Sequence, residues 1–141
     1  MNIYIRTQDN DLFKYFSDQD YALVMARAEA AFYKSGEILC EAGTIPDSFM
    51  MVQEGELELF GSHSIGNIYP GEFCGELFFL SQEPSPFNLR AAKDSYVLRL
   101  GFSELKDLIE ARPELMARIQ AAINDSLCLK IIRLTHRRNN G

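Results

Sequence analysis

The stretch PGEFCGELFFLSQEPSPFNLRA, residues 70–91, decides the fold of this chain and raises a question about its chemistry. Two close-set glycines, Gly71 and Gly75, precede an apolar run, and a Pro-Ser-Pro follows that run. Glycine allows a tight turn and a close approach of the backbone to a bound anion. The Pro-Ser-Pro supplies no cation where an anion-binding loop would keep an arginine. The question is whether this loop still holds a ligand.

The residues on both sides of this stretch predict a β-structure over residues 36–100. The segments GEILCEAG, SFMMVQEGELELFG, SIGNIYPGEF and FNLRAAKDSYVLRL have apolar residues at a period of about two and are divided by glycine or proline turns. Leu57 and Leu59 alternate with Glu56 and Glu58, so one face of the strand is apolar and the other is polar and faces solvent. The pattern predicts an antiparallel jelly-roll barrel, or double-stranded β-helix, of about eight strands.

Helical patterns flank the predicted barrel. Residues 10–32 repeat apolar residues at three and four, which predicts two short helices with Ser17 as an N-cap. Residues 103–138 predict a short helix capped by Ser103, a break at Pro113, and a long helix to about Arg138. The fold class is mainly β with flanking helices, and residues 1–141 are expected to form a single domain.

The long helix carries more apolar surface than one barrel needs. One stripe is formed by Met116, Ile119, Ile123, Leu127, Ile131 and Leu134. A second stripe is formed by Leu115, Ala122, Leu129 and Ile132, the first three spaced by seven. The first stripe is expected to pack on the barrel, and the second predicts a seam with the same helix of a second chain. The alternative is a helix buried by its own domain, or by a C-terminal segment that is missing from this sequence.

Composition and charge exclude several classes of protein. The formal net charge is −6, and four cations of the tail, Lys130, Arg133, Arg137 and Arg138, lie beyond residue 129, so residues 1–129 carry −10. An acidic body does not suit a nucleic-acid footprint, and the tail cations are expected to complement the carbonyl end of a helix. The sequence has neither a signal-peptide pattern nor a membrane-spanning run, so a cytoplasmic location without membrane contact is expected.

The residues that carry most catalytic chemistry are scarce. Cys40, Cys74 and Cys128 are scattered, without the spacing of a metal or disulfide framework, and are interpreted as small buried apolar residues. His63 and His136 are the only histidines, too few for the ligand cluster of a metal-dependent barrel enzyme. We expect no enzymatic activity, no metal and no cofactor.

Two motifs together resemble the cyclic-nucleotide-binding domain family, which includes the sensor domains of the catabolite activator protein, protein kinase A regulatory subunits and cyclic-nucleotide-gated channels. They are KSGEILCEAGTIPDSFMMVQEGELELF and YPGEFCGELFFL, and the resemblance covers about residues 12–134. The resemblance implies that Gly75, Glu76 and Leu77 open a phosphate-binding cassette, in which the glutamate accepts a hydrogen bond from a ribose hydroxyl. It also implies a short helix in which Phe78, Phe79 and Leu80 pack inward, and Phe73 and Phe87 are interpreted as barrel core.

The cassette departs from the family pattern at its arginine. When the cassette is aligned on Gly75-Glu76 before it and on the strand LRAAKDSYVLRL after it, the position of the phosphate-binding arginine falls on Ser85. Pro86 follows, and it has no backbone N–H. Arg90 lies on the next strand and is not expected to substitute. A charge-assisted hydrogen bond contributes about 1.5 to 3 kcal/mol, so its loss weakens binding roughly ten- to hundredfold. Glu76, without a positive neighbour, would also repel a phosphate, so ordinary cAMP or cGMP binding is not expected.

Three functions remain open from the sequence. The first is a regulatory module that signals through its C-terminal helix, with at most a nucleotide-like small molecule as ligand. The second is a working cyclic-nucleotide sensor. The third is the sensor part of a catabolite-activator-type transcription regulator, but only seven residues follow Leu134, too few for a helix-turn-helix, so direct DNA binding by this chain is not expected.

Overall fold

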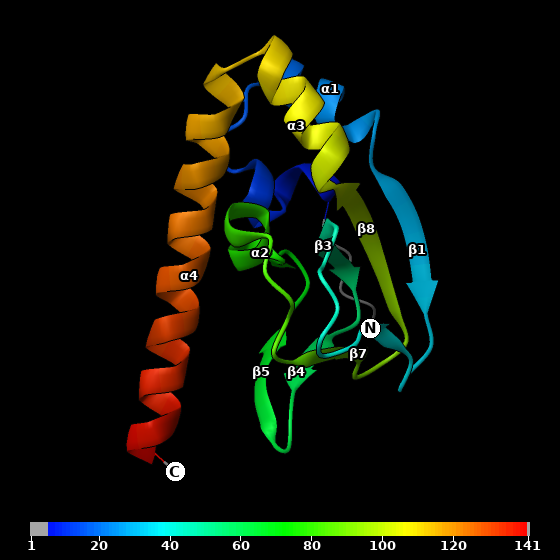
Figure 1. Cartoon of the computed structure of the whole chain (residues 1–141), viewed down its shortest axis with the longest axis vertical. Coiled ribbons are helices and arrows are strands. Elements are labelled where there is room, and N and C mark those ends of the chain that lie inside the picture. The colour runs from blue at the N-terminus through cyan, green and yellow to red at the C-terminus, as the bar shows by residue number, and fades with distance from the viewer. Residues whose placement is uncertain (1–5, 141) are drawn as a thin grey trace.

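The computed structural model describes residues 6–140, with side chains for residues 6–136, and consists of two packed antiparallel sheets flanked by helices (Figure 1). The first sheet has the strand order β1-β8-β3-β6, and the second has the order β2-β7-β4-β5. The strands are β1 (Glu29–Tyr33), β2 (Ile38–Cys40), β3 (Ser48–Glu54), β4 (Leu57–Phe60), β5 (Ser64–Ile68), β6 (Phe73–Cys74), β7 (Asn88–Ala91) and β8 (Ser95–Gly101). The helices are η1 (Thr7–Asp9), η2 (Asp11–Phe13), α1 (Asp18–Met25), α2 (Glu76–Ser81), α3 (Phe102–Ala111) and α4 (Glu114–Asn140). The eight strands confirm the predicted jelly-roll class.

The N-terminal segment differs from the prediction of two helices over residues 10–32. Ser17 does cap α1, in a capping box closed by Asp20, as predicted. Residues 29–33, however, form strand β1, whose Glu29 pairs with Arg99 and whose Tyr33 pairs with Ser95 of β8. The alanine-rich run has helical propensity, but the exposed edge of β8 offers it a full set of backbone partners. The helical prediction for residues 29–32 was therefore wrong.

Two separate hydrophobic cores hold the layers together. The first lies between the two sheets and contains Met50, Val52, Leu57, Ile68, Leu89, Ala91 and Val97. The second lies between the first sheet and the helices and is centred on Phe49, whose ring is 5.1 Å from that of Phe79 and 5.0 Å from that of Phe102. This second core fixes α2, which carries the cassette, against α3 and the start of α4.

The C-terminal helices follow directly from the last strand. Helix α3 begins at Phe102, whose backbone N–H donates to the Asp47 carbonyl, and its N-cap is Gly101. Ser103 lies inside the first turn, so the prediction of Ser103 as N-cap was wrong. The predicted break is present, because α3 ends at Ala111 and α4 begins at Glu114, directly after Pro113.

Helix α4 runs along one side of the molecule (Figure 1). Its first turns pack on the helical core, and its later turns run past α2 and the β4–β5 hairpin. Within the described residues, no helix has the length and apolar character needed to cross a membrane.

Candidate ligand site beneath the C-terminal helix

The cassette is a sharp turn from β6 into α2, and its geometry requires Gly75. This residue has φ +107°, and a Cβ there would lie 2.9 Å from the Ser48 carbonyl oxygen. Helix α2 then buries Phe79 in the helical core, whereas Leu77 and Leu80 are more than half exposed. The prediction that Leu80 packs inward was therefore wrong, because a helix this short offers only one buried face.

Glu76, the first residue of α2, is buried and bound by α4 at both carboxylate oxygens. Lys130 Nζ lies 2.5 Å from Glu76 Oε1, and Ser126 Oγ donates to Glu76 Oε2 at 3.2 Å. Lys130 Nζ also donates to the Phe73 carbonyl at 3.0 Å. Glu76 is thus 6% exposed and fully paired. The expectation that Glu76 lacks a positive neighbour was wrong, since the cation comes from the tail rather than from the cassette.

Ser85, which the sequence analysis aligned with the family arginine, is buried in a turn of its own. Its hydroxyl donates to the Phe87 carbonyl at 2.8 Å and accepts from the Phe87 N–H at 3.2 Å. Its backbone is tied to the loop after β2, because Ser85 N donates to the Thr44 carbonyl and the Ser85 carbonyl accepts from Gly43 N. Pro86 is exposed and borders the cavity described below. This turn presents no positive charge to a ligand.

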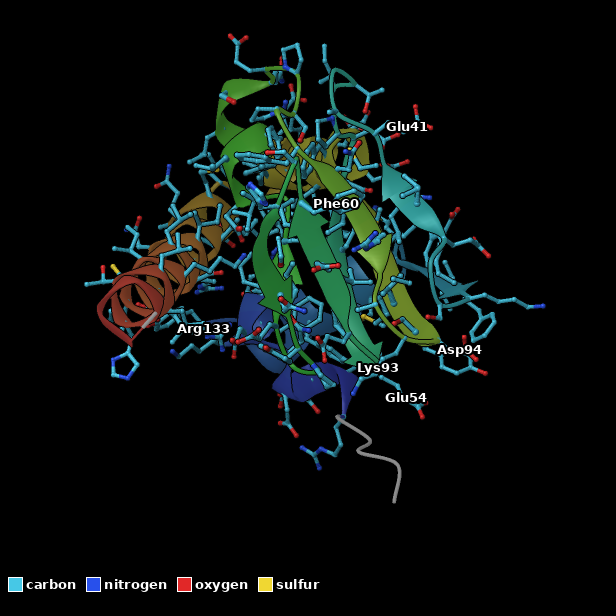
Figure 2. The ribbon with its side chains drawn as sticks, turned by 90° about the horizontal axis from the view of Figure 1, so that it is seen from below. Glu41, Glu54, Phe60, Lys93, Asp94 and Arg133 are labelled. Atoms are coloured by element: carbon cyan, nitrogen blue, oxygen red, sulfur yellow. The ribbon has the colours of Figure 1, made fainter. Side chains whose placement is uncertain are left out.

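Arg90 is paired with an acid of the neighbouring strand β4, Glu58. On β7, Leu89 and Ala91 are buried between the sheets, so the side chain of Arg90 lies on the opposite face. Its Nε donates to Glu58 Oε1 at 2.8 Å, and its guanidinium carbon lies 4.2 Å from the centre of the Phe60 ring. These contacts hold the Arg90 guanidinium on that face, and Figure 2 labels Phe60 on β4.

A cavity of about 940 Å³ lies between α2, the β4–β5 hairpin and the later turns of α4. Gly75, Glu76, Leu77 and Pro86 all border it, so the fold brings four of the five predicted cassette residues together, and Ser85 is the exception. Most of its other lining residues are apolar, among them Leu59, Ile68, Phe78, Phe87, Leu127 and Ile131. Phe87 is therefore a partly buried wall residue rather than barrel core, whereas Phe73 is fully buried as predicted.

A second ion pair fixes α4 one turn beyond Lys130. Arg133 Nη1 donates to Glu72 Oε1 at 3.0 Å, Nη2 bonds the other oxygen, and the guanidinium carbon lies 5.3 Å from the Tyr69 ring centre. Figure 2 shows Arg133 between α4 and the body of the molecule. The hydrogen bond to Glu72 raises the pKa of Arg133 above its usual value. Lys130 therefore binds Glu76 of α2, and Arg133 binds Glu72 just before β6 of the two packed sheets, called the β-roll below, so neither complements the helix end. The side chains of Arg137 and Arg138 lie outside the described residues.

The cysteines and histidines add no reactive centre to this site. Burial raises the pKa of the Cys74 thiol to about 12, so it is neutral at ordinary pH. Cys128 is exposed on α4, contrary to the expectation of a buried residue, and Cys40 is half-buried. His63 lies exposed in the turn after β4, and His136 is exposed on α4. Among the residues that the structure describes, no group of three His, Cys, Asp or Glu side chains could hold a metal ion.

The residues of the predicted dimer seam do not form one surface. Leu115 and Ala122 are buried in the helical core, whereas Leu129 and Ile132 are 38% and 63% exposed. In the other stripe, Ile131 is likewise exposed rather than packed on the barrel. The seam over Leu115 and Ala122 was therefore wrong, because these turns of α4 face η2, α3 and the first sheet. Leu129 and Ile132 stay available for a partner.

Sequence reasoning missed the α4 residues that complete the site. Ser126 and Lys130 are four residues apart and Arg133 follows three residues later, so all three lie on one helix face. The spacing of these polar residues on one face of α4 was the available signal. Their partners Glu72 and Glu76, also four apart in sequence, flank the cassette glycine.

Comparison with known proteins places the fold and the cassette in a family. The family "Cyclic nucleotide-binding domain" matches residues 31–112, which is more than half of the chain. The chain belongs to the cyclic nucleotide-binding domain family. The catabolite activator protein of Thermus thermophilus has a similar fold, with a TM-score of 0.73 at 20% identity over 92% of this chain and 63% of that chain. The N-terminal domain of a transcriptional regulator from Streptomyces coelicolor gives a TM-score of 0.74 at 23% identity over 89% of this chain and 92% of that one.

Curated relatives of this cyclic nucleotide-binding domain are longer proteins. An uncharacterized ABC transporter ATP-binding protein of Mycobacterium tuberculosis is 31% identical over 99 residues, which are 60% of this chain and 30% of that protein. The cAMP-dependent protein kinase regulatory subunit of Aspergillus fumigatus is 30% identical over 101 residues, 70% of this chain and 24% of that protein. The chain therefore spans 30% or less of the length of these two relatives.

Proposed function

We propose that this chain is a regulatory domain of the cyclic-nucleotide-binding type whose output is the position of the later turns of α4. The observation that carries the proposal is the pairing of both Glu76 carboxylate oxygens with Lys130 and Ser126 of α4. A ligand that engages Glu76 must compete with α4, and a ligand that fills the cavity beside it contacts α4 directly. Ligand occupancy and helix position are thereby coupled, because each changes the free energy of the other.

Ordinary cAMP and cGMP are not the ligands in this proposal. Ser85 is held in a neutral turn and Arg90 binds Glu58, so neither supports a phosphate. Lys130 is the cation nearest to the cassette glutamate, but it neutralises Glu76 and has no charge to spare. The loss of a charge-assisted clamp lowers affinity roughly ten- to hundredfold.

Calorimetric titration with cAMP, cGMP and cyclic dinucleotides tests the choice of ligand. We expect no saturable heat with wild type, and a gain of nucleotide binding when Ser85→Arg is combined with Pro86→Ala. Lys130→Met serves as the matched variant. Micromolar binding by wild type that Lys130→Met abolishes would contradict the proposal and identify Lys130 as a phosphate clamp in a working nucleotide sensor.

Hydrogen exchange of α4 amides tests the output. Lys130→Met keeps the aliphatic stem and removes the charge, so we expect faster exchange over residues 124–136 and unchanged exchange over residues 114–123. Lys93→Met is the control, because Lys93 is exposed and pairs only with Glu56 on the β-roll. Unchanged exchange in the later turns of Lys130→Met would refute the role of this ion pair in holding α4.

A further inference from the structure

The cavity beneath α4 is lined by side chains whose chemistry selects a particular class of ligand. Its apolar wall residues come from four elements: Leu59 from β4, Ile68 from β5, Phe78 from α2, and Leu127 with Ile131 from α4. Three aromatic rings, those of Tyr69, Phe78 and Phe87, border the same space. Pockets for small molecules occupy about 300 to 1,000 Å³ and are mostly apolar with a few polar groups. The cavity of about 940 Å³ fits this class.

Three charged groups that border the cavity, Glu76, Lys130 and Arg133, are already paired within the protein. Lys130 is paired with Glu76 at 2.5 Å, and Arg133 is paired with Glu72. Asn67 donates to Glu56 Oε2 at 2.6 Å. A charged ligand would have to break one of these pairs, which leaves a carboxylate or a cation unpaired in an apolar site. An uncharged ligand leaves them intact.

The floor of the cavity contains an unfilled position at Gly66. This residue pairs with Leu59 in the β4–β5 ladder, and both residues border the cavity. A Cβ built on Gly66 would meet no atom within 4 Å, and its φ lies outside the left-handed region. The backbone therefore does not require glycine here, and a larger side chain would enter the cavity.

The size of the cavity favours a small molecule over a helix from a second copy of this chain. A helix is 10–12 Å across and rises about 5.4 Å per turn, so about 940 Å³ accommodates less than roughly two turns. The polar pairs at Lys130 and Arg133 also interrupt the apolar wall within that length. A compact ligand avoids both obstacles.

We propose that the cavity between α2, the β4–β5 hairpin and α4 binds an uncharged, predominantly apolar small molecule with an aliphatic or aromatic body. The inference rests on the proposed function, because it names the ligand class of the same site. Binding such a molecule buries apolar surface of α4 that is otherwise exposed, at Ile131 in particular. The ligand would hold the later turns of α4 against the β-roll and add to the two ion pairs.

The test is a fluorescence titration of the full chain with N-phenyl-1-naphthylamine, a neutral apolar dye. We expect saturable binding of one dye per chain, displacement by 1-decanol, and no displacement by cAMP. Gly66→Leu fills the floor and Ile131→Glu places a charge on the wall, so each should weaken dye binding tenfold or more. Tyr96→Ser is the control, because Tyr96 is exposed in a separate aromatic contact with Phe32. Circular dichroism of each variant establishes that it is folded.

Several results would overturn the inference. Dye binding that does not saturate places the dye outside the cavity. The same conclusion follows if Gly66→Leu and Ile131→Glu both leave dye binding unchanged while Tyr96→Ser weakens it. Stronger displacement by decanoate than by 1-decanol contradicts the uncharged class. A dye stoichiometry that falls as the protein concentration rises assigns the cavity to a second copy of the chain. Dye binding that is sensitive to Gly66→Leu but leaves α4 hydrogen exchange unchanged supports the ligand class and refutes the proposed output.

Discussion

The two halves of α4 are held by different forces. In residues 114–123, Leu115, Ile119, Ala122 and Ile123 are almost completely buried in the helical core. In residues 124–136, the apolar side chains Leu129, Ile131, Ile132 and Leu134 are exposed, and the polar contacts of Lys130 and Arg133 attach the helix. The first half is therefore part of the helical core, whereas from the second half Leu127 packs against that core while only partly buried. Under the proposed function, the first half anchors α4 and the second half is the part that moves.

Among the tests of this comparison between the two halves of α4, the largest effect on the free energy of unfolding is expected for a buried residue of the first half. Ile119→Ala removes a fully buried side chain, so we expect the free energy of unfolding to fall by about 3 kcal/mol. Leu134→Ala, in the exposed half, should change it by less than about 0.5 kcal/mol. Urea denaturation monitored by circular dichroism measures both. Equal losses for the two variants would mean that α4 is a uniform structural element.

An intermediate effect is expected at the junction where the first half begins. Asp20 of α1 is fully buried and accepts from Arg112 Nη2 at 2.9 Å and from Arg118. Asp20→Asn should reduce stability by about 2 to 3 kcal/mol at neutral pH, since it weakens a buried ion pair. The control is Asp125→Asn, which removes a solvent-exposed pair with Lys14 and should reduce stability far less than Asp20→Asn.

The pH dependence of the Asp20 variant sharpens the same test. Burial by itself raises the pKa of Asp20, but the hydrogen bonds from Ser17 and Arg118 and the charge of Arg118 outweigh it, so the pKa lies below its ordinary value of 3.8. The stabilisation by Asp20 is therefore complete above pH 3.8 and is lost as the pH falls through the lower pKa of the folded state. The difference between wild type and Asp20→Asn should shrink only in that acidic range. A difference that disappears near neutral pH would contradict this account.

The smallest effect on stability is expected in the exposed half, where a self-association test is more informative. Homodimerisation stays a prediction, now limited to the exposed residues Leu129 and Ile132 and their neighbours. Ile132→Arg should leave the free energy of unfolding within about 0.5 kcal/mol and should shift sedimentation from a dimer to a monomer. Glu110→Arg, on the exposed surface of α3, is a charge control. A monomer mass for wild type at all concentrations down to low micromolar would exclude the dimer.

The sequence predicted the β-roll well because its signals are local. Strand alternation, as in Leu57 and Leu59, and turn glycines, such as Gly75, follow from the backbone conformation of neighbouring residues. Strand β1 was not predictable in this way, because its helical propensity is overridden by the partner strand β8. Pairing with β8 therefore determines the strand conformation of residues 29–33, which the local sequence pattern does not indicate.

Only the cassette side of the candidate site could be predicted from the sequence, and the α4 side could not. The cassette residues Gly75 and Glu76 belong to a continuous motif, so their place next to a cavity could be inferred. Lys130 lies 54 residues from Glu76, and nothing in the local pattern relates the two. The direction in which α4 leaves the break at Pro113 determines this contact. That direction depends on packing in the helical core rather than on any short motif.

Because α4 is continuous past Ile123, a small tilt of the helix about that residue produces a displacement that grows toward its C-terminal end. At 1.5 Å per residue, Lys130 lies about 10 Å and Leu134 about 17 Å beyond Ile123, the last side chain fully anchored in the core. A tilt of roughly 10° about that point moves Lys130 by about 2 Å and Leu134 by about 3 Å. A displacement of that size directed away from α2 would lengthen the contact between Lys130 Nζ and Glu76 Oε1, which is 2.5 Å. Under the proposed function, a ligand that holds this part of α4 against the two sheets would oppose such a tilt where its displacement is largest.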